Sequence, residues 1–150
     1  MEQLTIDGTE LLNETTETEA LSKFYKAFNM KDMLLMEQSW LNTDEISMDN
    51  PIGGILRGWK EIGHGYNKIF NGKAEVYVKF YDFSIHKSQN MFFATGREQG
   101  YFKTDKLEIP LEVRTTRIFI LQYGNWKQIH HHGSIDNPEL LKTYQEAILQ

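Results

Sequence analysis

Two arginines occupy the middle of segments whose alternating residues are typical of β-strands. Arg97 lies within FATGREQG and Arg117 within RTTRIFIL, where apolar residues occur on both faces of the expected strand. A guanidinium is costly to bury unless it meets an anion or a carboxylate partner. Its fork of N–H donors suits a carboxylate or a phosphate. The pattern indicates an anion-binding site, a buried ion pair with Glu98, Glu108 or Glu112, or a rim position with the guanidinium in water.

Three consecutive histidines, His130, His131 and His132, end another strand-like segment. Successive strand residues point to opposite faces, so His130 and His132 should share one face and His131 the other. Two histidines at i and i+2 could bind a metal, but no third ligand stands at a motif spacing, so we predict no metal site. By the same alternation, Trp126 and Gln128 should lie with His130 and His132, and Ile129 and Gly133 with His131.

Histidine is also the usual general base near neutral pH. No serine or aspartate partner is marked by a motif such as the nucleophile elbow, so the catalytic residues stay unassigned. The alternative for His130 and His132 is a polar sheet face at an interface.

Ile62, Tyr66 and Phe70 follow one another at helical spacing and form an apolar stripe. Core packing is the simplest interpretation of such a stripe. Tyr66 would still present its hydroxyl at the wall of a pocket beneath the helix.

Composition and charge exclude several classes of protein. A chain of 150 residues with 40% hydrophobic residues fits one domain with a packed core. The net charge of −5 argues against a nucleic-acid partner, because phosphate binding calls for a basic surplus. The acidic N-terminus does not resemble a signal peptide, and no apolar run is long enough to span a bilayer. Without cysteines there is no thiolate chemistry, and we expect a cytoplasmic protein with no membrane partner.

The order of elements predicts an α+β domain. We expect residues 1–14 to be an N-terminal tail and residues 15–150 to form the domain. Helices should begin after the caps Thr16 and Asp32 and near Trp59, the last ending at a left-handed residue in Asn71-Gly72. Four long strands should follow, over 74–86, 91–103, 111–122 and 126–134, with short strands at 45–48 and 55–56 and a C-terminal helix after Asp136. A curved antiparallel sheet wrapped around the N-terminal helices would leave a cone-shaped cavity.

Three strings, in this order and spacing, resemble the nuclear transport factor 2-like superfamily and especially its SnoaL-like members: FYKAFNMKDMLLM, NPIGGILRGWKEI and TTRIFILQYGNWKQIHHHGS. The resemblance covers about Thr16 to Ile135. It implies the cystatin-like cone and a homodimer formed through the outer sheet face, a use that would suit Ile118, Ile120 and Trp126.

Two better-understood groups of relatives imply different functions. Ketosteroid-isomerase-like enzymes carry an aspartate base where this chain has Asn50, a tyrosine nearest Phe24 and an acid nearest Thr116, so that mechanism is not expected. The association domain of calcium/calmodulin-dependent protein kinase II has pocket arginines that match Arg97 and Arg117. Its third arginine corresponds to Gly133, its pocket histidine to Ile62 and its pocket tryptophan to Phe70, and its alignment places His131 on the inner face.

We therefore predict a homodimeric domain that binds a small, anionic ligand such as a carboxylate in an internal pocket, without a cofactor. The predicted ligand-binding residues are Arg97, Arg117, Tyr66, Phe70 and His131. The first alternative is a cofactor-independent isomerase, lyase or hydrolase that uses a pocket histidine as general base. The second is a dimerisation or interaction module with no small-molecule activity.

Overall fold

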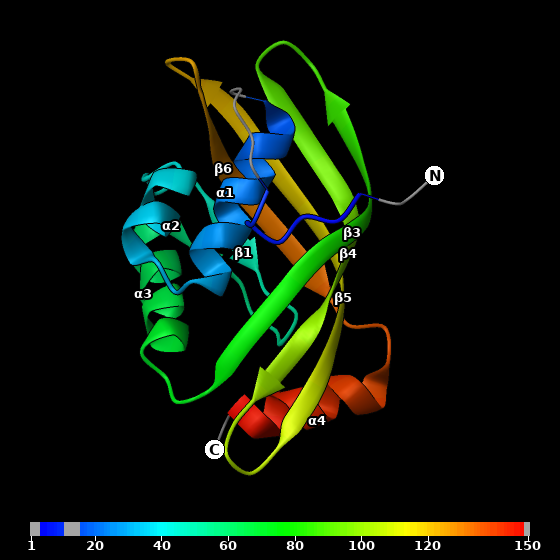
Figure 1. Ribbon diagram of the computed structural model, residues 1–150. Helices are drawn as coiled ribbons and strands as arrows, with labels where there is room; N and C mark the ends of the chain where they lie inside the picture. The colour runs from blue at the N-terminus through cyan, green and yellow to red at the C-terminus, as the bar shows by residue number, and fades with distance from the viewer. Residues whose placement is uncertain (1–3, 11–15, 149–150) are drawn as a thin grey trace.

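A six-stranded, curved and unclosed sheet forms the body of the protein, in the strand order β2-β1-β6-β5-β4-β3. The computed structural model describes residues 4–10 and 16–148. Helices α1, α2 and α3 lie on one side of the sheet, and α4 lies across the end where the N-terminal helices do not reach (Figure 1). The elements are α1 (Glu17–Asn29), α2 (Met33–Ser39), β1 (Ser47–Asp49), β2 (Leu56–Arg57), α3 (Gly58–Phe70), β3 (Glu75–Lys87), β4 (Met91–Lys103), β5 (Glu108–Gln122), β6 (Asn125–Ser134) and α4 (Pro138–Ile148). The predicted α+β class is confirmed.

Local signals set the helix starts. The N–H of Glu19 donates to Thr16 Oγ1 at 3.2 Å, and the N–H of Leu35 donates to Asp32 Oδ1 at 3.0 Å. Both predicted caps are therefore confirmed. The predicted stop at Asn71-Gly72 is confirmed, since α3 ends at Phe70 with Asn71 as its C-cap. The left-handed conformation expected there is wrong, because Asn71 has φ −93° and ψ −1°, and Gly72 does not have a positive φ either.

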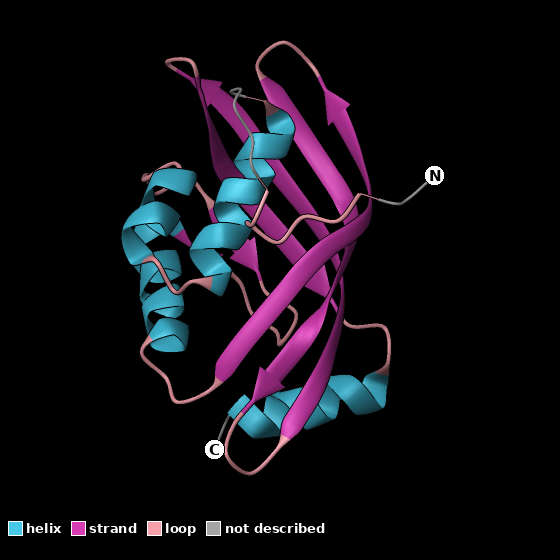
Figure 2. Cartoon of the chain, viewed as in Figure 1, coloured by secondary structure: helices cyan, strands magenta, loops and turns pink. Residues whose placement is uncertain are grey.

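One pair of strands departs from the antiparallel arrangement that the sequence predicted. Strand β1 runs parallel to β6, with Ser47 opposite His130, Met48 opposite His131 and Asp49 opposite His132. A parallel pair needs a long connection between its strands. Here α3 and three long strands separate β1 from β6 along the chain, so no local signal marks the pairing (Figure 2).

A β-bulge decides which side chains of β6 face the helices. Ile118 lies opposite His130, but the next residue, Phe119, lies opposite Gln128, so Ile129 is the extra residue. The bulge exchanges the faces on either side of it. Gln128 is fully buried, and Trp126 packs edge-on against Phe92 at 4.9 Å. The prediction that these two residues share a face with His130 and His132 is wrong for this reason, and so is the suggestion that Trp126 lies on the outer face.

The segment that we expected to be a tail contributes to the core where the structure describes it. Ile6 is fully buried and exchanges two backbone hydrogen bonds of 2.8 Å with Phe80 of β3. Asn29 of α1 fixes the same segment, because its side-chain amide donates to the carbonyls of Asp7 and Val78 at 2.9 and 2.8 Å. Residues 4–10 are thus part of the fold, while residues 1–3 and 11–14 of the expected tail lie outside the described residues.

No helix in the described parts of the chain is both long and apolar enough to cross a bilayer.

We expect Ile6→Ala to lower the free energy of unfolding by about 2 to 5 kcal/mol, because it removes a fully buried side chain and leaves a cavity. Leu4→Ala is the matched control: Leu4 is 55% exposed, and its replacement should change stability by less than about 0.5 kcal/mol. Urea denaturation of both variants measures the difference. Equal effects would mean that the N-terminal segment does not dock on β3.

Candidate functional site

Arg117 lies at the centre of the protein, with its side chain 3% exposed. Its Nη2 donates to Glu98 Oε2 at 3.2 Å, its Nη1 to Gln128 Oε1 at 2.9 Å and its Nε to the Tyr25 hydroxyl at 3.2 Å. The guanidinium carbon stands 3.7 Å from the centre of the Phe24 ring, within the range of a cation–π interaction. The side chain is therefore held from α1, β4 and β6 at once.

The charge of Arg117 is already balanced. Burial alone would lower the pKa of Arg117, but the nearby oxygens of Tyr25 and Glu98 outweigh it and raise that pKa. Glu98 is only 7% exposed at its side chain, so the two charges form a buried ion pair. Of the alternatives that the sequence left open for Arg117, the structure shows the ion pair with Glu98.

A chain of hydrogen bonds leads from Glu98 to His131. Thr115 Oγ1 donates its only proton to Glu98 Oε1 at 2.6 Å. In its 3.4 Å contact with His131 Nε2, the Thr115 oxygen must therefore accept, which places the ring proton on Nε2. Nδ1 of His131 then carries a lone pair, and this atom is buried without a hydrogen-bond partner among the described residues.

His131 is a neutral histidine. Burial lowers its pKa well below the ordinary value, and the charges of Arg117, His130 and His132 lower it further. Gln128 Nε2 is a second buried atom without a partner in the described parts of the chain. Next to the Arg117 network, His131 Nδ1 is thus an unmatched acceptor and the side-chain amide nitrogen of Gln128 an unmatched donor. Among the described residues, the other buried side-chain atoms without a hydrogen-bond partner are Glu19 Oε2, Ser39 Oγ and Trp40 Nε1.

Aromatic rings enclose this polar group from the helix side. Tyr66 of α3 is 3% exposed, and its ring centre lies 6.3 Å from those of both Phe24 and Trp40. Burial raises the pKa of Tyr66 to about 12, although the positive charge of Arg117 opposes the rise. Tyr66 is therefore a protonated hydroxyl beside Arg117 at any physiological pH.

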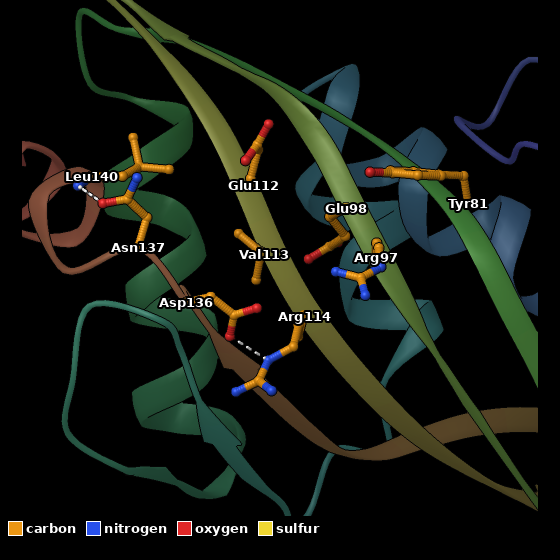
Figure 3. A pocket seen from close by; sticks show the side chains of 9 residues that line it. All are labelled: Tyr81, Arg97, Glu98, Glu112, Val113, Arg114, Asp136, Asn137 and Leu140. Carbon is orange, nitrogen blue, oxygen red and sulfur yellow. Dashed lines mark hydrogen bonds and ion pairs between the residues drawn. The ribbon is translucent and has the colours of Figure 1, made fainter.

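A cavity of about 160 Å³ opens beside Glu98, between β4, β5 and the start of α4 (Figure 3). Its rim carries two ion pairs, Arg97 Nε with Asp82 Oδ2 at 3.1 Å and Arg114 Nε with Asp136 Oδ1 at 2.7 Å. Pockets for drug-sized ligands run from about 300 to 1,000 Å³, so this cavity fits only a very small molecule. Its lining residues are Tyr81, Arg97, Glu98, Glu112, Val113, Arg114, Asp136, Asn137 and Leu140.

The structure does not bring Arg97 and Arg117 together. Arg97 lies opposite Arg114 in the register of β4 and β5, whereas Arg117 lies opposite Ala94. The three-residue offset places the two guanidinium groups on opposite faces of the sheet, and the side chain of Arg97 is 52% exposed. The expected pocket gripped by both arginines is therefore replaced by a buried Arg117 and a surface Arg97.

The other predicted site residues divide in a similar way. Tyr66 and His131 lie in the interior near Arg117, whereas Phe70 is half-buried and packs against Tyr66 and Phe28 at 6.0 and 6.2 Å. Among the interior polar residues that the sequence did not single out are Tyr25, Thr115 and Gln128. Thr115 had a signal, since it shares a strand face with Arg117, but the bulge in β6 concealed Gln128.

The curved sheet, the helices against one face and the polar residues between them define a domain of the nuclear transport factor 2-like, cystatin-like class. The chain belongs to the SnoaL-like domain family, which it matches over residues 18–138.

Solved structures agree with this fold. A candidate association domain of calcium/calmodulin-dependent protein kinase type II from Thiobacillus denitrificans aligns over 85% of this chain and 100% of its own, with a TM-score of 0.65 and 19% identity. A candidate dehydratase of the NTF2-like family from Streptomyces avermitilis aligns over 77% of this chain and 91% of its own, with a TM-score of 0.67 and 21% identity.

A relative by sequence is the F-box protein SKIP8 of Arabidopsis thaliana, which is 21% identical over 117 residues. That match covers 76% of this chain and 47% of the relative, so the chain spans about half the length of that protein.

Because folding depresses the pKa of His131, its contribution to stability is present above the unfolded pKa of about 6.5 and is lost as the pH falls below it. We expect the unfolding free energy to fall by up to about 1.4 kcal/mol per pH unit more steeply in the wild type than in His131→Gln over this range. Denaturant titrations at pH 5 to 8 measure the slopes. His64→Gln, at an exposed position on α3, should keep the wild-type slope, and a wild-type slope in His131→Gln would contradict a buried neutral imidazole.

Proposed function

We propose that this domain binds a small, neutral molecule in its interior beside Arg117, reached through the cavity at Glu98. The observation that carries the proposal is the pair of unmatched buried atoms, Gln128 Nε2 and His131 Nδ1, at the edge of an otherwise paired network. Each unpartnered buried polar atom costs about 1 to 3 kcal/mol. A core that served stability alone would be more stable with apolar residues here.

The two unmatched atoms determine which hydrogen-bonding groups the ligand must carry. Gln128 Nε2 offers an N–H and needs an acceptor such as a carbonyl oxygen, while His131 Nδ1 needs an O–H or N–H donor. A primary amide, a hydroxyketone or a protonated carboxylic acid carries both groups within a few atoms. The cavity of about 160 Å³ at Glu98 is the route that this proposal gives the ligand, and neither Gln128 nor His131 is among its lining residues.

The balanced charges around the proposed site favour an uncharged ligand. Arg117 is paired with Glu98 and Arg97 with Asp82, so neither arginine brings an unbalanced positive charge to a ligand. An ionised carboxylate placed beside Glu98 would add a second negative charge in a buried setting, which is costly. The sequence suggested an anionic ligand because it assumed two unpaired arginines. With both arginines paired, we propose a neutral carbonyl compound in its place.

Thermal-shift and calorimetric titrations with matched pairs test this proposal, for example lactamide against lactate and propionamide against propionate. We expect the amides to stabilise the wild type more than the carboxylates. Gln128→Glu keeps the oxygen that accepts from Arg117 and removes the N–H, so it should weaken amide binding by about tenfold, the loss of one hydrogen bond in a buried site. His86→Gln, at an exposed position on β3 away from the cavity, should bind like the wild type. If no compound binds, or if His86→Gln is as impaired as Gln128→Glu, the proposal is wrong.

A second candidate function is general base catalysis by His131 in an isomerase, lyase or hydrolase. It is favoured by one observation: among the described residues, the buried Nδ1 of His131 has no hydrogen-bond partner, so its lone pair faces no competing donor. The lowered pKa of His131 makes this imidazole a weaker base than a free one. A compound that binds in the titrations above can be assayed for turnover. Turnover lost in His131→Gln with binding retained supports the base, and equal turnover by both proteins rules it out.

We propose, further, that the protein forms a homodimer through the outer face of the sheet. Met91 and Phe93 on β4 are 43% and 39% exposed, and they lie opposite Ile120 and Ile118 of β5, so four apolar side chains adjoin on this face.

Light scattering should give twice the monomer mass of 17.6 kDa for the wild type, and Phe93→Glu with Ile118→Glu should give the monomer. Leu34→Glu is the control, because Leu34 is 67% exposed on α2 and away from this face. A monomeric wild type would contradict the dimer.

A further inference from the structure

His130 and His132 stand on the outer face of β6, opposite in direction to the buried His131. The sequence offered these two histidines and no third metal ligand at a motif spacing. The parallel pairing of β1 with β6 supplies one, because it places Asp49 directly opposite His132. One potential ligand atom from each of Asp49, His130 and His132 lies within 4.8 Å of the other two.

We propose that Asp49, His130 and His132 bind a divalent transition-metal ion such as Zn²⁺. Two imidazoles and one carboxylate are ligands that suit Zn²⁺, Co²⁺ or Fe²⁺, whereas Mg²⁺ and Ca²⁺ prefer sets of oxygen ligands. Three protein ligands leave a coordination position for water or for another small ligand. This site is separate from the interior described above, since the sheet lies between the two.

One of the distances between the ligand atoms already matches a metal site, and the others are at most 4.8 Å. Bonds of about 2.0 to 2.2 Å in tetrahedral geometry hold neighbouring ligand atoms about 3.3 Å apart. His132 Nδ1 and Asp49 Oδ2 are already 3.0 Å apart. The remaining adjustment falls on surface side chains that have room to rotate, since the His132 side chain is 58% exposed and that of Asp49 24% exposed.

Ser47 orients the ring of His130 through a hydrogen bond to the ring nitrogen that would not bind the metal. Its hydroxyl lies 2.7 Å from His130 Nδ1, so that hydrogen bond holds the ring and leaves Nε2 for the metal. The register makes this arrangement possible, because Ser47 lies opposite His130 just as Asp49 lies opposite His132. Because residues two apart on a strand share a face, the Ser47–His130 and Asp49–His132 contacts lie next to each other on the same side of the sheet.

The contact between His132 and Asp49 also indicates what the bound metal ion would replace. The hydrogen bond between Nδ1 and Oδ2 contains a proton, and a metal ion bound to both atoms replaces it.

The test uses protein without a polyhistidine tag, treated with EDTA and then dialysed. Zn²⁺ is titrated by calorimetry against a competing chelator, and Co²⁺ is followed by its visible absorption. We expect one metal ion per chain, and losses of affinity of at least about tenfold in His130→Ala, His132→Ala and Asp49→Asn. Ser47→Ala should weaken binding less than these three. Circular dichroism of each variant checks that it is folded.

Two surface histidines elsewhere provide the controls. His64→Ala on α3 and His86→Ala on β3 remove exposed imidazoles and should leave Zn²⁺ affinity unchanged. The absence of saturable one-to-one binding to the wild type would overturn the proposal. So would binding that survives the combined His130→Ala and His132→Ala substitution, or that the control substitutions reduce as much.

Discussion

The buried ion pair of Arg117 with Glu98 is the constraint on which the rest of the structure depends. A guanidinium inside a protein must have its charge balanced and its N–H groups paired, or the fold loses several kcal/mol. Here α1 supplies Tyr25 and the Phe24 ring, β4 supplies Glu98, and β6 supplies Gln128. The pair therefore joins the helical layer to three strands, and the rings around it keep water away.

The bulge between β5 and β6 decides what this network contains. If Ile129 took a regular position in the ladder instead of forming the bulge, Gln128 would point outward with His130 and Arg117 would lose an acceptor. His131 would still point inward with Arg117, since both belong to the part of the strand beyond the bulge. The bulge thus allows one ten-residue strand to serve two sites, with Gln128 and His131 inside and His130 and His132 outside.

Several features could be read from the sequence because their causes are local. The caps at Thr16 and Asp32 need only a side-chain oxygen three residues before a backbone N–H. The four long strands follow from the period of two, and the resemblance to SnoaL-like proteins led to the family that the chain matches. The true partner of Arg117, Glu98, was among the three glutamates that the sequence suggested. The suggestion rested on the general rule that buried charges are paired.

The sequence by itself determined the α+β class, the helix starts and the long strands, while the inner position of His131 followed only from the family resemblance and that of Arg117 was left open. Tertiary structure alone decided that Arg97 lies opposite Arg114 and not beside Arg117, that Gln128 turns inward, and that Ile6 docks on β3. It also decided that Asp49 meets His132 across the parallel pair. The physical reason is that helix caps and strand periods depend on neighbours in the chain, whereas register, bulges and parallel pairing depend on how distant segments pack together.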